Sequence, residues 1–162
     1  MSRAPVVLRD LLDPGRVRVA VEAPGKRELL QTLADQAAQT LGLDPDAVFD
    51  VLWARERLST TGIGRGIALP HGRVPGLAKV QGLVAKLAKP LAFESPDGRP
   101  VDLVFLLLAP SDAGADHLHA LAGVLRVLRD ETVGETLRRA PDAAALYRAL
   151  MLPPPVSAVN AA

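Results

Sequence analysis

One histidine follows a glycine-rich stretch near the middle of the chain. Residues 59–73 read STTGIGRGIALPHGR, in which alternating glycines precede Pro70 and His71. Glycine tolerates a positive φ and close backbone approach, so such a run can turn several N–H groups toward one anion. Neutral imidazole is a nucleophile near pH 7, with one nitrogen free to react while the other donates the hydrogen bond that fixes the tautomer. The segment therefore predicts a phosphate site at His71.

A phosphoryl group on His71 adds about −1.5 to −2 charges at neutral pH, by analogy with phosphoserine. Backbone amides and arginine side chains can absorb such a charge, and the chain supplies both close to His71. The alternative is that the glycines only form a tight turn and that His71 ends a strand. The spacing matches neither a P-loop, which requires G-x-x-x-x-G-K-[ST], nor a dinucleotide fingerprint, which opens a helix.

Three short segments together resemble a known signature: Arg55-Glu56, residues 60–64 (TTGIG) and residues 66–72 (GIALPHG). The signature is that of the fructose, mannitol and nitrogen-type enzyme IIA domains of the bacterial phosphoenolpyruvate-dependent phosphotransferase system. The similarity covers nearly the whole chain. The family usually has G-S-T-G-I-G, whereas this chain has S-T-T-G-I-G, so Ser59 replaces a glycine and Thr60 keeps the hydroxyl of the serine.

The resemblance implies a role for each matching residue. His71 accepts a phosphoryl group from an HPr-like phosphocarrier protein (NPr), and His117, which matches a second family histidine, assists it. No metal ion and no cofactor take part. For Arg55, the pattern alone also allows a cation that stabilises the end of its helix. The residues expected to position the phosphoryl group and neutralise its charge are Arg55, Thr60, Thr61, Gly62, Ile63 and Gly64.

A helix expected at residues 116–129 carries the two other histidines. At about 100° per residue, its apolar stripe is Leu118, Leu121, Ala122, Leu125 and Leu128. His117 lies at the margin of this stripe, and His119 lies on the far side. Residues two apart on a helix do not share a face, so only one of them can point into the same site as His71. We expect His117 to do so and His119 to face solvent.

Strands and helices alternate along the chain. Residues 101–109 (VDLVFLLLA) are almost all apolar and predict a central strand covered on both faces. The pattern predicts an α/β fold, a three-layer α/β/α sandwich with a central mixed β-sheet. One domain spans residues 1–152, and a mobile tail is expected at 153–162. Further strands are expected at 17–21 and 80–87, the latter ended by Lys89-Pro90, a helical turn at 8–12, and helices at 26–41, from 45 to the glycine stretch, at 131–139 and at 142–150.

Composition excludes several classes of protein. The 19 basic and 18 acidic residues are spread without blocks, which argues against nucleic-acid binding driven by phosphate attraction. The absence of cysteine excludes a disulfide scaffold and a thiolate metal site, and it agrees with a cytoplasmic location. The longest apolar run, residues 103–109, is far shorter than the roughly 20 residues of a membrane helix. We expect a cytoplasmic protein with no membrane insertion.

Two branches of the family fit the chain. With no IIB domain and no membrane segment, a stand-alone nitrogen-regulatory IIA protein is expected, a phosphotransferase with a transient phosphohistidine that controls partner proteins by its phosphorylation state. The alternative is a fructose or mannitol-type sugar-transport component that passes phosphate to a IIB domain. The sequence leaves the downstream partner and the oligomeric state open, a homodimer included.

Two functions outside the family remain as alternatives. One is a non-catalytic module whose glycine loop holds an anionic metabolite. The other is a metallohydrolase with His71, Asp116, His117 and His119 as ligands. Zinc binds such side chains, but ligands two residues apart favour a strand, and here they lie in a predicted helix.

Overall fold

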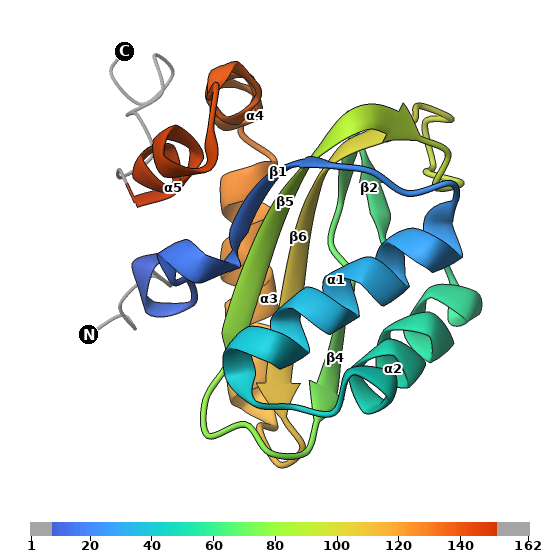
Figure 1. The fold of residues 1–162 in the computed structure, drawn as a ribbon, viewed down its shortest axis with the longest axis vertical. Coiled ribbons are helices and arrows are strands. Elements are labelled where there is room, and N and C mark those ends of the chain that lie inside the picture. The colour runs from blue at the N-terminus through green and yellow to red at the C-terminus, as the bar shows by residue number, and fades with distance from the viewer. Residues whose placement is uncertain (1–7, 152–162) are drawn as a thin grey trace.

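The computed structural model describes residues 8–151, and the tail expected at 153–162 lies outside them. Two 3₁₀ turns (Leu8–Asp10 and Pro14–Arg16) lead into the first strand (Figure 1). The strands are β1 (Val17–Val21), β2 (Gly62–Gly64), β3 (Ile67–Ala68), β4 (His71–Val74), β5 (Gln81–Leu91) and β6 (Val101–Pro110). The helices are α1 (Lys26–Leu41), α2 (Pro45–Leu58), α3 (Ala115–Leu128), α4 (Glu131–Arg139) and α5 (Ala143–Met151).

The strands form one mixed sheet built around β6. Its order is β1-β5-β6-β3-β2, and β4 pairs with β6 farther along the same edge as β3. Strands β3 and β4 run parallel to β6, whereas β5 runs antiparallel to it. Ile67 lies opposite Leu103 and His71 lies opposite Leu107, so β6 fixes both ends of the segment between them.

Side chains of β6 alternate between two hydrophobic layers. Val104, Leu106 and Leu108 pack with α1 and α2. Leu103, Phe105 and Leu107 pack with α3, α4 and α5 on the opposite face (Figure 1). All six are at most 3% exposed, as expected for a strand covered on both sides. The predicted three-layer α/β/α sandwich is confirmed.

Local capping explains why the first helices keep their predicted bounds. Gly42 ends α1 in the left-handed conformation at φ 70°, which glycine adopts without steric cost. Asp44 then caps α2 by accepting a hydrogen bond from the amide of Asp46, and Pro45 occupies the first helical position. These signals are local, and the sequence therefore predicts both helices well.

The expectation that Lys89-Pro90 ends a strand is wrong, because β5 continues to Leu91. The register between β5 and β6 shifts between Lys86 and Leu91, so the ladder is irregular where the proline lies. Proline lacks a backbone N–H and is tolerated at such irregular positions.

The apolar stripe predicted for α3 is wrong in part: Leu128 is buried and Leu121 and Leu125 pack against the core, but the other two members do not. Leu118 is 64% exposed, and Ala122 is exposed as well. The buried face consists of His117, Ala120, Gly123, Val124 and Leu128. Small residues let the helix approach the sheet closely, whereas the prediction relied mainly on the leucines. The rotation places His117 within the buried face rather than at its margin. Among residues 8–151, no helix combines the length and apolarity needed to cross a membrane.

Candidate functional site

His71 is the first residue of β4 and is partly exposed. Its ring nitrogen Nδ1 lies 2.9 Å from the carbonyl oxygen of Leu69. A carbonyl can only accept, so Nδ1 carries the proton and donates it. The backbone is fixed as well, because the amide of Leu107 on β6 donates to the carbonyl of Pro70 at 2.9 Å. This geometry leaves the lone pair of His71 on Nε2.

The surroundings of His71 keep its ring neutral. Burial lowers the pKa of His71, and the positive charge of Arg55 lowers it further, against the hydrogen bond to Leu69 and the charge of Glu56, which raise it. The net shift is downward from the usual value near 6.5. At neutral pH the imidazole is therefore a free base, the form that acts as a nucleophile.

His117, near the start of α3, lies beside His71. The two ring centroids are 5.7 Å apart, and the planes meet at 69°. The His117 side chain is only 7% exposed. Its Nδ1 accepts a hydrogen bond from Nε of Arg73 at 3.2 Å, so the ring proton is on Nε2. Within the described residues, Nε2 of His117 is buried without a hydrogen-bond partner. Burial, then the charges of His71 and Arg73, lower the pKa of His117.

The four residues considered above as zinc ligands do not come together as a metal site in the described part of the chain. Among residues 8–151, no group of three or more histidine, aspartate and glutamate side chains is placed to hold a metal ion. His119 is partly buried on α3, and Asp116 is exposed. The structure brings His71 and His117 together without the other two members of the set.

Arg55 lies in the last turn of α2, and this helix packs next to β4. Its Nη1 donates to the carbonyl of Ser59 at 2.8 Å, the residue that ends the helix. A cation at this position also suits the negative end of the helix dipole. Its positive charge is, after burial, the second cause that lowers the pKa of His71.

The threonines between Arg55 and the glycines already have hydrogen-bond partners. The Thr60 hydroxyl donates to the carbonyl of Phe93 at 2.7 Å and accepts from the amide of Gly62 at 3.1 Å. The amide and hydroxyl of Thr61 both donate to the carboxylate of Glu56. These bonds hold the base of the segment rigidly.

The alternating glycines form a β-hairpin directed away from His71. Gly64, Arg65 and Gly66 all have positive φ and make its turn. Gly64 lies opposite Ile67, at the level of Leu103 on β6, four residues from the level of His71. At about 3.3 Å per residue, the tip is about 13 Å from His71 along the strand. The tight-turn alternative therefore describes the glycines of the tip, but its second part is wrong, because His71 begins β4 instead of ending a strand.

The tip of the hairpin is fixed by Arg138 on α4 and by Asp97, which lies between β5 and β6. Arg138 on α4 donates through Nη2 to the carbonyl of Arg65 at 2.6 Å and to Asp102 at 2.8 Å. The amide of Arg65 donates to Asp97 at 2.7 Å. Both the base and the tip of the hairpin are therefore anchored to other parts of the fold.

Arg73 is a site residue whose role the sequence did not reveal. A signal was available, because residues two apart in a strand point to the same face, and Arg73 follows His71 by two. Recognising it required knowing that His71 begins a strand. Glu56 was seen only as part of the family signature, and its contacts with Thr61 depend on the tertiary fold.

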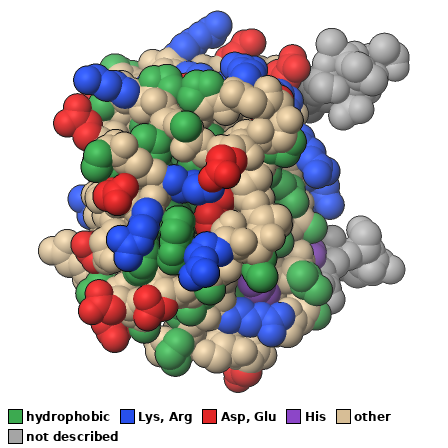
Figure 2. All heavy atoms as spheres, turned by 90° about the vertical axis from the view of Figure 1, so that its right-hand side faces the viewer, with side chains coloured by type: hydrophobic (Ala, Val, Ile, Leu, Met, Phe, Trp, Pro, Cys, Tyr) green, Lys and Arg blue, Asp and Glu red, His purple; other side chains and the backbone are tan. Residues whose placement is uncertain are grey.

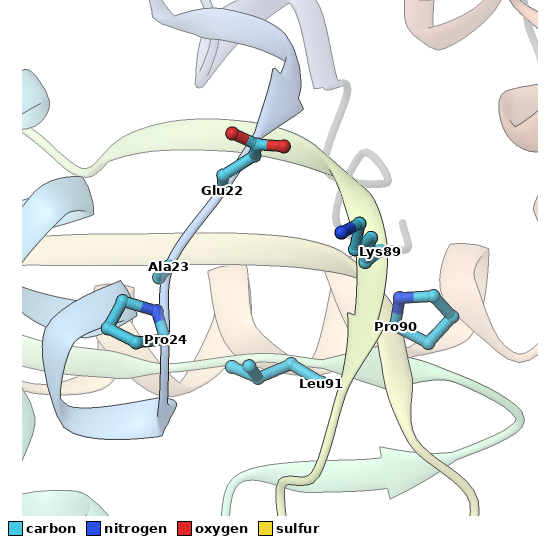
Figure 3. Close-up of a pocket in the computed structure, with 6 residues that line it drawn as sticks. All are labelled: Glu22, Ala23, Pro24, Lys89, Pro90 and Leu91. Carbon is cyan, nitrogen blue, oxygen red and sulfur yellow. The ribbon is translucent and has the colours of Figure 1, made fainter.

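The histidine pair reaches solvent through His71, which is partly exposed, whereas His117 is almost completely buried. Figure 2 shows histidine side chains reaching the surface among basic and hydrophobic ones. A hollow of about 430 Å³ lies where β1 and β5 separate, lined by Glu22, Ala23, Pro24, Lys89, Pro90 and Leu91 (Figure 3). Leu91 pairs with Val101, six residues from the level of His71 on β6, or about 20 Å. The hollow is therefore separate from the histidine pair.

Known proteins resemble this chain over most of its length. Residues 10–151 match the family described as "Phosphoenolpyruvate-dependent sugar phosphotransferase system, EIIA 2". The chain is 50% identical over 151 residues to a "Nitrogen regulatory protein" of Bradyrhizobium diazoefficiens, covering 93% of this chain and 99% of that one. It is 36% identical over 121 residues to a "PTS system fructose-specific EIIA component" of Haloferax volcanii, covering 74% and 79%.

A solved structure has the same fold. The crystal structure of the nitrogen regulatory protein IIA-Ntr from Neisseria meningitidis superposes with a TM-score of 0.81 at 30% identity, covering 88% of this chain and 98% of that one. The resemblance seen in the sequence is thus confirmed. This chain belongs to the EIIA 2 family of the phosphoenolpyruvate-dependent sugar phosphotransferase system.

Proposed function

We propose that the protein is a phosphoryl carrier that accepts a phosphoryl group on Nε2 of His71 from an HPr-like phosphocarrier protein of the NPr type. The observation that carries this proposal is the pair of opposite tautomers at the site. His71 presents a lone pair on Nε2, and His117 presents an N–H on Nε2 that has no partner in the described residues. A nucleophile beside an unused donor is the arrangement that phosphoryl transfer needs.

The transfer step follows from these positions. The lone pair on Nε2 of His71 forms a bond to phosphorus while the P–N bond to the carrier breaks, and the carrier's imidazole keeps that electron pair. The ring of His71 gains positive character, which its Nδ1–H shares with the carbonyl of Leu69. No proton has to leave the site during the step, and positioning with charge stabilisation accounts for the catalysis.

Two further groups act on the phosphoryl oxygens in this proposal. The Nε2–H of His117 donates to one of them, and the guanidinium of Arg55 lowers the energy of the added negative charge. A direct role for Thr60, Thr61, Gly62, Ile63 and Gly64 stays a prediction. It requires that the amides of Thr61 and Gly62 exchange their present acceptors for phosphoryl oxygens.

The regulatory branch is the proposed physiological role. Support comes from the 50% identity to a protein named nitrogen regulatory protein over nearly the full length of both chains. In this role, regulatory target proteins respond to the phosphorylation state of His71. The second candidate is a sugar-transport role with a IIB domain as acceptor, favoured by the similarity to the fructose-specific component. Exchange with a phosphocarrier requires a shared compartment, and we propose the cytoplasm, with which the lack of cysteine agrees.

One labelling experiment tests the carrier role. The protein is incubated with phosphoenolpyruvate, enzyme I and the HPr-like carrier, and intact mass is measured. We expect a gain of one phosphoryl group that is labile in acid, stable in alkali and absent from His71→Ala. Label that persists in His71→Ala rules out the site. A wild-type protein that takes up no label favours the anion-binding module instead.

A transfer assay and a pull-down separate the two branches. Phosphorylated protein is mixed with a fructose-type IIB domain, and wild type and His71→Ala are compared as baits. Rapid loss of the label to IIB supports the sugar-transport role. A protein retained by only one of the two baits supports the regulatory role.

A further inference from the structure

Glu56 is a buried carboxylate next to the site that none of the roles above uses. It lies on α2 and is only 4% exposed. Nζ of Lys26 is 3.1 Å from Oε2, while the amide and the hydroxyl of Thr61 both donate to Oε1. A buried charge is costly unless it is paired and hydrogen-bonded, and Glu56 is both. The two bonds from Thr61 connect Glu56 to the segment that ends at His71.

A continuous series of hydrogen bonds leads from Thr61 to the imidazole. The carbonyl of Thr61 accepts a bond from the amide of Leu69 at 2.9 Å. The carbonyl of Leu69, on the same residue, accepts the proton of Nδ1 of His71, also at 2.9 Å. Leu69 is thus held by its amide and holds His71 by its carbonyl. Thr61 is therefore one of the residues whose position fixes that carbonyl.

We propose that Glu56 is a positioning residue which, through Thr61 and Leu69, holds a carbonyl against Nδ1 of His71 and so keeps Nε2 unprotonated and available. For its effect on transfer this inference rests on the proposed carrier function, but the tautomer of His71 can be measured without any transfer. Orienting partners of this kind fix histidine tautomers in metal sites, and the same physical reasoning applies to a nucleophile.

The charge of Glu56 matters as well as its shape. Hydrogen bonds to an ionised carboxylate are roughly twice as strong as those between neutral groups. In Glu56→Gln, the side chain keeps one acceptor oxygen but loses the charge, and its NH₂ group meets the ammonium of Lys26. In Thr61→Val, the hydroxyl donor is lost while the amide donor and the shape of the side chain remain. Thr61→Ser restores the hydroxyl.

Ring ¹⁵N chemical shifts of His71 in the unphosphorylated protein at pH 7.5 test the proposal. We expect wild type to show the Nδ1–H tautomer alone, with Glu56→Gln and Thr61→Val showing a mixture of the two tautomers. Thr61→Ser should restore the wild-type shifts. The matched control is Glu94→Gln, which alters the exposed partner of Lys26 but leaves the series to His71 intact.

The rate of phosphorylation by the HPr-like carrier gives a second measurement. It should fall by about tenfold in Glu56→Gln and Thr61→Val, the lower end of the loss seen for orienting partners of metal-bound histidines. It should stay at the wild-type value in Glu94→Gln. Unfolding free energies of all variants separate positioning from stability, because a merely structural role lowers stability without changing the tautomer.

The possible results distinguish the positioning role of Glu56 from the carrier function. Unchanged tautomer shifts in Thr61→Val and Glu56→Gln overturn the positioning role, whether or not the rate or the stability falls. If Glu56→Gln does not fold, the comparison of Thr61→Val with Thr61→Ser decides alone. A wild-type protein that fails to take up phosphate, but whose variants show the expected tautomer mixture, refutes the carrier function and leaves the positioning role standing.

Discussion

Nε of Arg73 lies 3.2 Å from Nδ1 of His117, and this contact determines which ring nitrogen of His117 carries the proton. His71 uses its own Nδ1 in the opposite sense, as a donor to Leu69. The two Nε2 atoms that remain therefore differ, because one carries a lone pair and the other a proton. A nucleophile and a hydrogen-bond donor thus arise from two residues of the same type.

The first prediction concerns Arg73. In Arg73→Met, Nδ1 of His117 loses its donor, so the proton is no longer confined to Nε2 and the donor to the phosphoryl oxygen is present only part of the time. We expect the rate of phosphoryl transfer to fall about tenfold, equivalent to about 1.4 kcal/mol of transition-state stabilisation. Stopped transfer reactions analysed by mass provide the rate. Arg73→Lys is the control that keeps the charge, and an unaffected rate in Arg73→Met contradicts the role of Arg73.

The second prediction concerns which ring nitrogen carries the phosphate. Since Nδ1 of His71 is occupied by the carbonyl of Leu69, the new P–N bond must form at Nε2. Coupling between ³¹P and ¹⁵N in the labelled, phosphorylated protein identifies the nitrogen directly. A phosphoryl group found on Nδ1 shows that the bond to Leu69 does not control the reaction.

The third prediction concerns stability against pH. The pKa values of both His71 and His117 are lowered in the folded protein, first by burial. The unfolded chain, with histidine pKa values near 6.5, therefore binds more protons below that pH, so the free energy of unfolding decreases as pH falls. The full contribution is present above about pH 7.5, and each histidine adds a slope of at most about 1.4 kcal/mol per pH unit.

Urea unfolding at pH 8, 7, 6 and 5 measures this slope. We expect His71→Gln and His117→Gln each to reduce the slope between pH 6.5 and 5, and the double variant to reduce it further. A slope that is the same in the double variant and in wild type assigns the pH dependence to other groups.

The fourth prediction concerns Gly72, which follows His71 on β4. A Cβ added at Gly72 collides with Cγ1 of Val51 on α2, one turn before Arg55. Overpacking of this kind costs about 1–3 kcal/mol, and the shift of α2 also displaces Arg55. We expect Gly72→Ala to lower both the unfolding free energy and the rate of phosphorylation.

Gly15→Ala is the matched control for Gly72→Ala. Its added Cβ makes an ordinary contact at 3.4 Å with the Asp13 carboxylate. The change in unfolding free energy should stay within about 0.5 kcal/mol. If the two alanine variants have equal unfolding free energies, α2 accommodates the added methyl group without loss of stability, which contradicts the prediction.

The sequence predicted those parts of the fold that local signals determine. Asp44, Pro45 and Gly42 mark helix ends by their own chemistry, and the short apolar run of β6 favours a strand covered on both sides. Helical geometry also predicted that only one of His117 and His119 could lie beside His71, and His117 does.

What the sequence did not predict depends on contacts between distant segments. Helix α3 carries leucines on several of its sides, so the leucines alone do not identify its buried face. That face is decided by how closely Ala120 and Gly123 let the helix approach the sheet. The glycines could form a nest or a hairpin, and pairing of β3 with β6 selects the hairpin. The partners of Glu56 come from α1 and from the base of that hairpin, which no spacing rule connects.

The hairpin that leads into His71 is fastened at its base by Glu56 and at its tip by Arg138. Nothing in it has to fold over the imidazole before the reaction can begin. In the proposed carrier role, the rate of exchange is then governed by how often two preformed surfaces collide in the correct orientation, which charge and concentration control. Such a protein can respond to the supply of phosphorylated carrier without the delay of a conformational step.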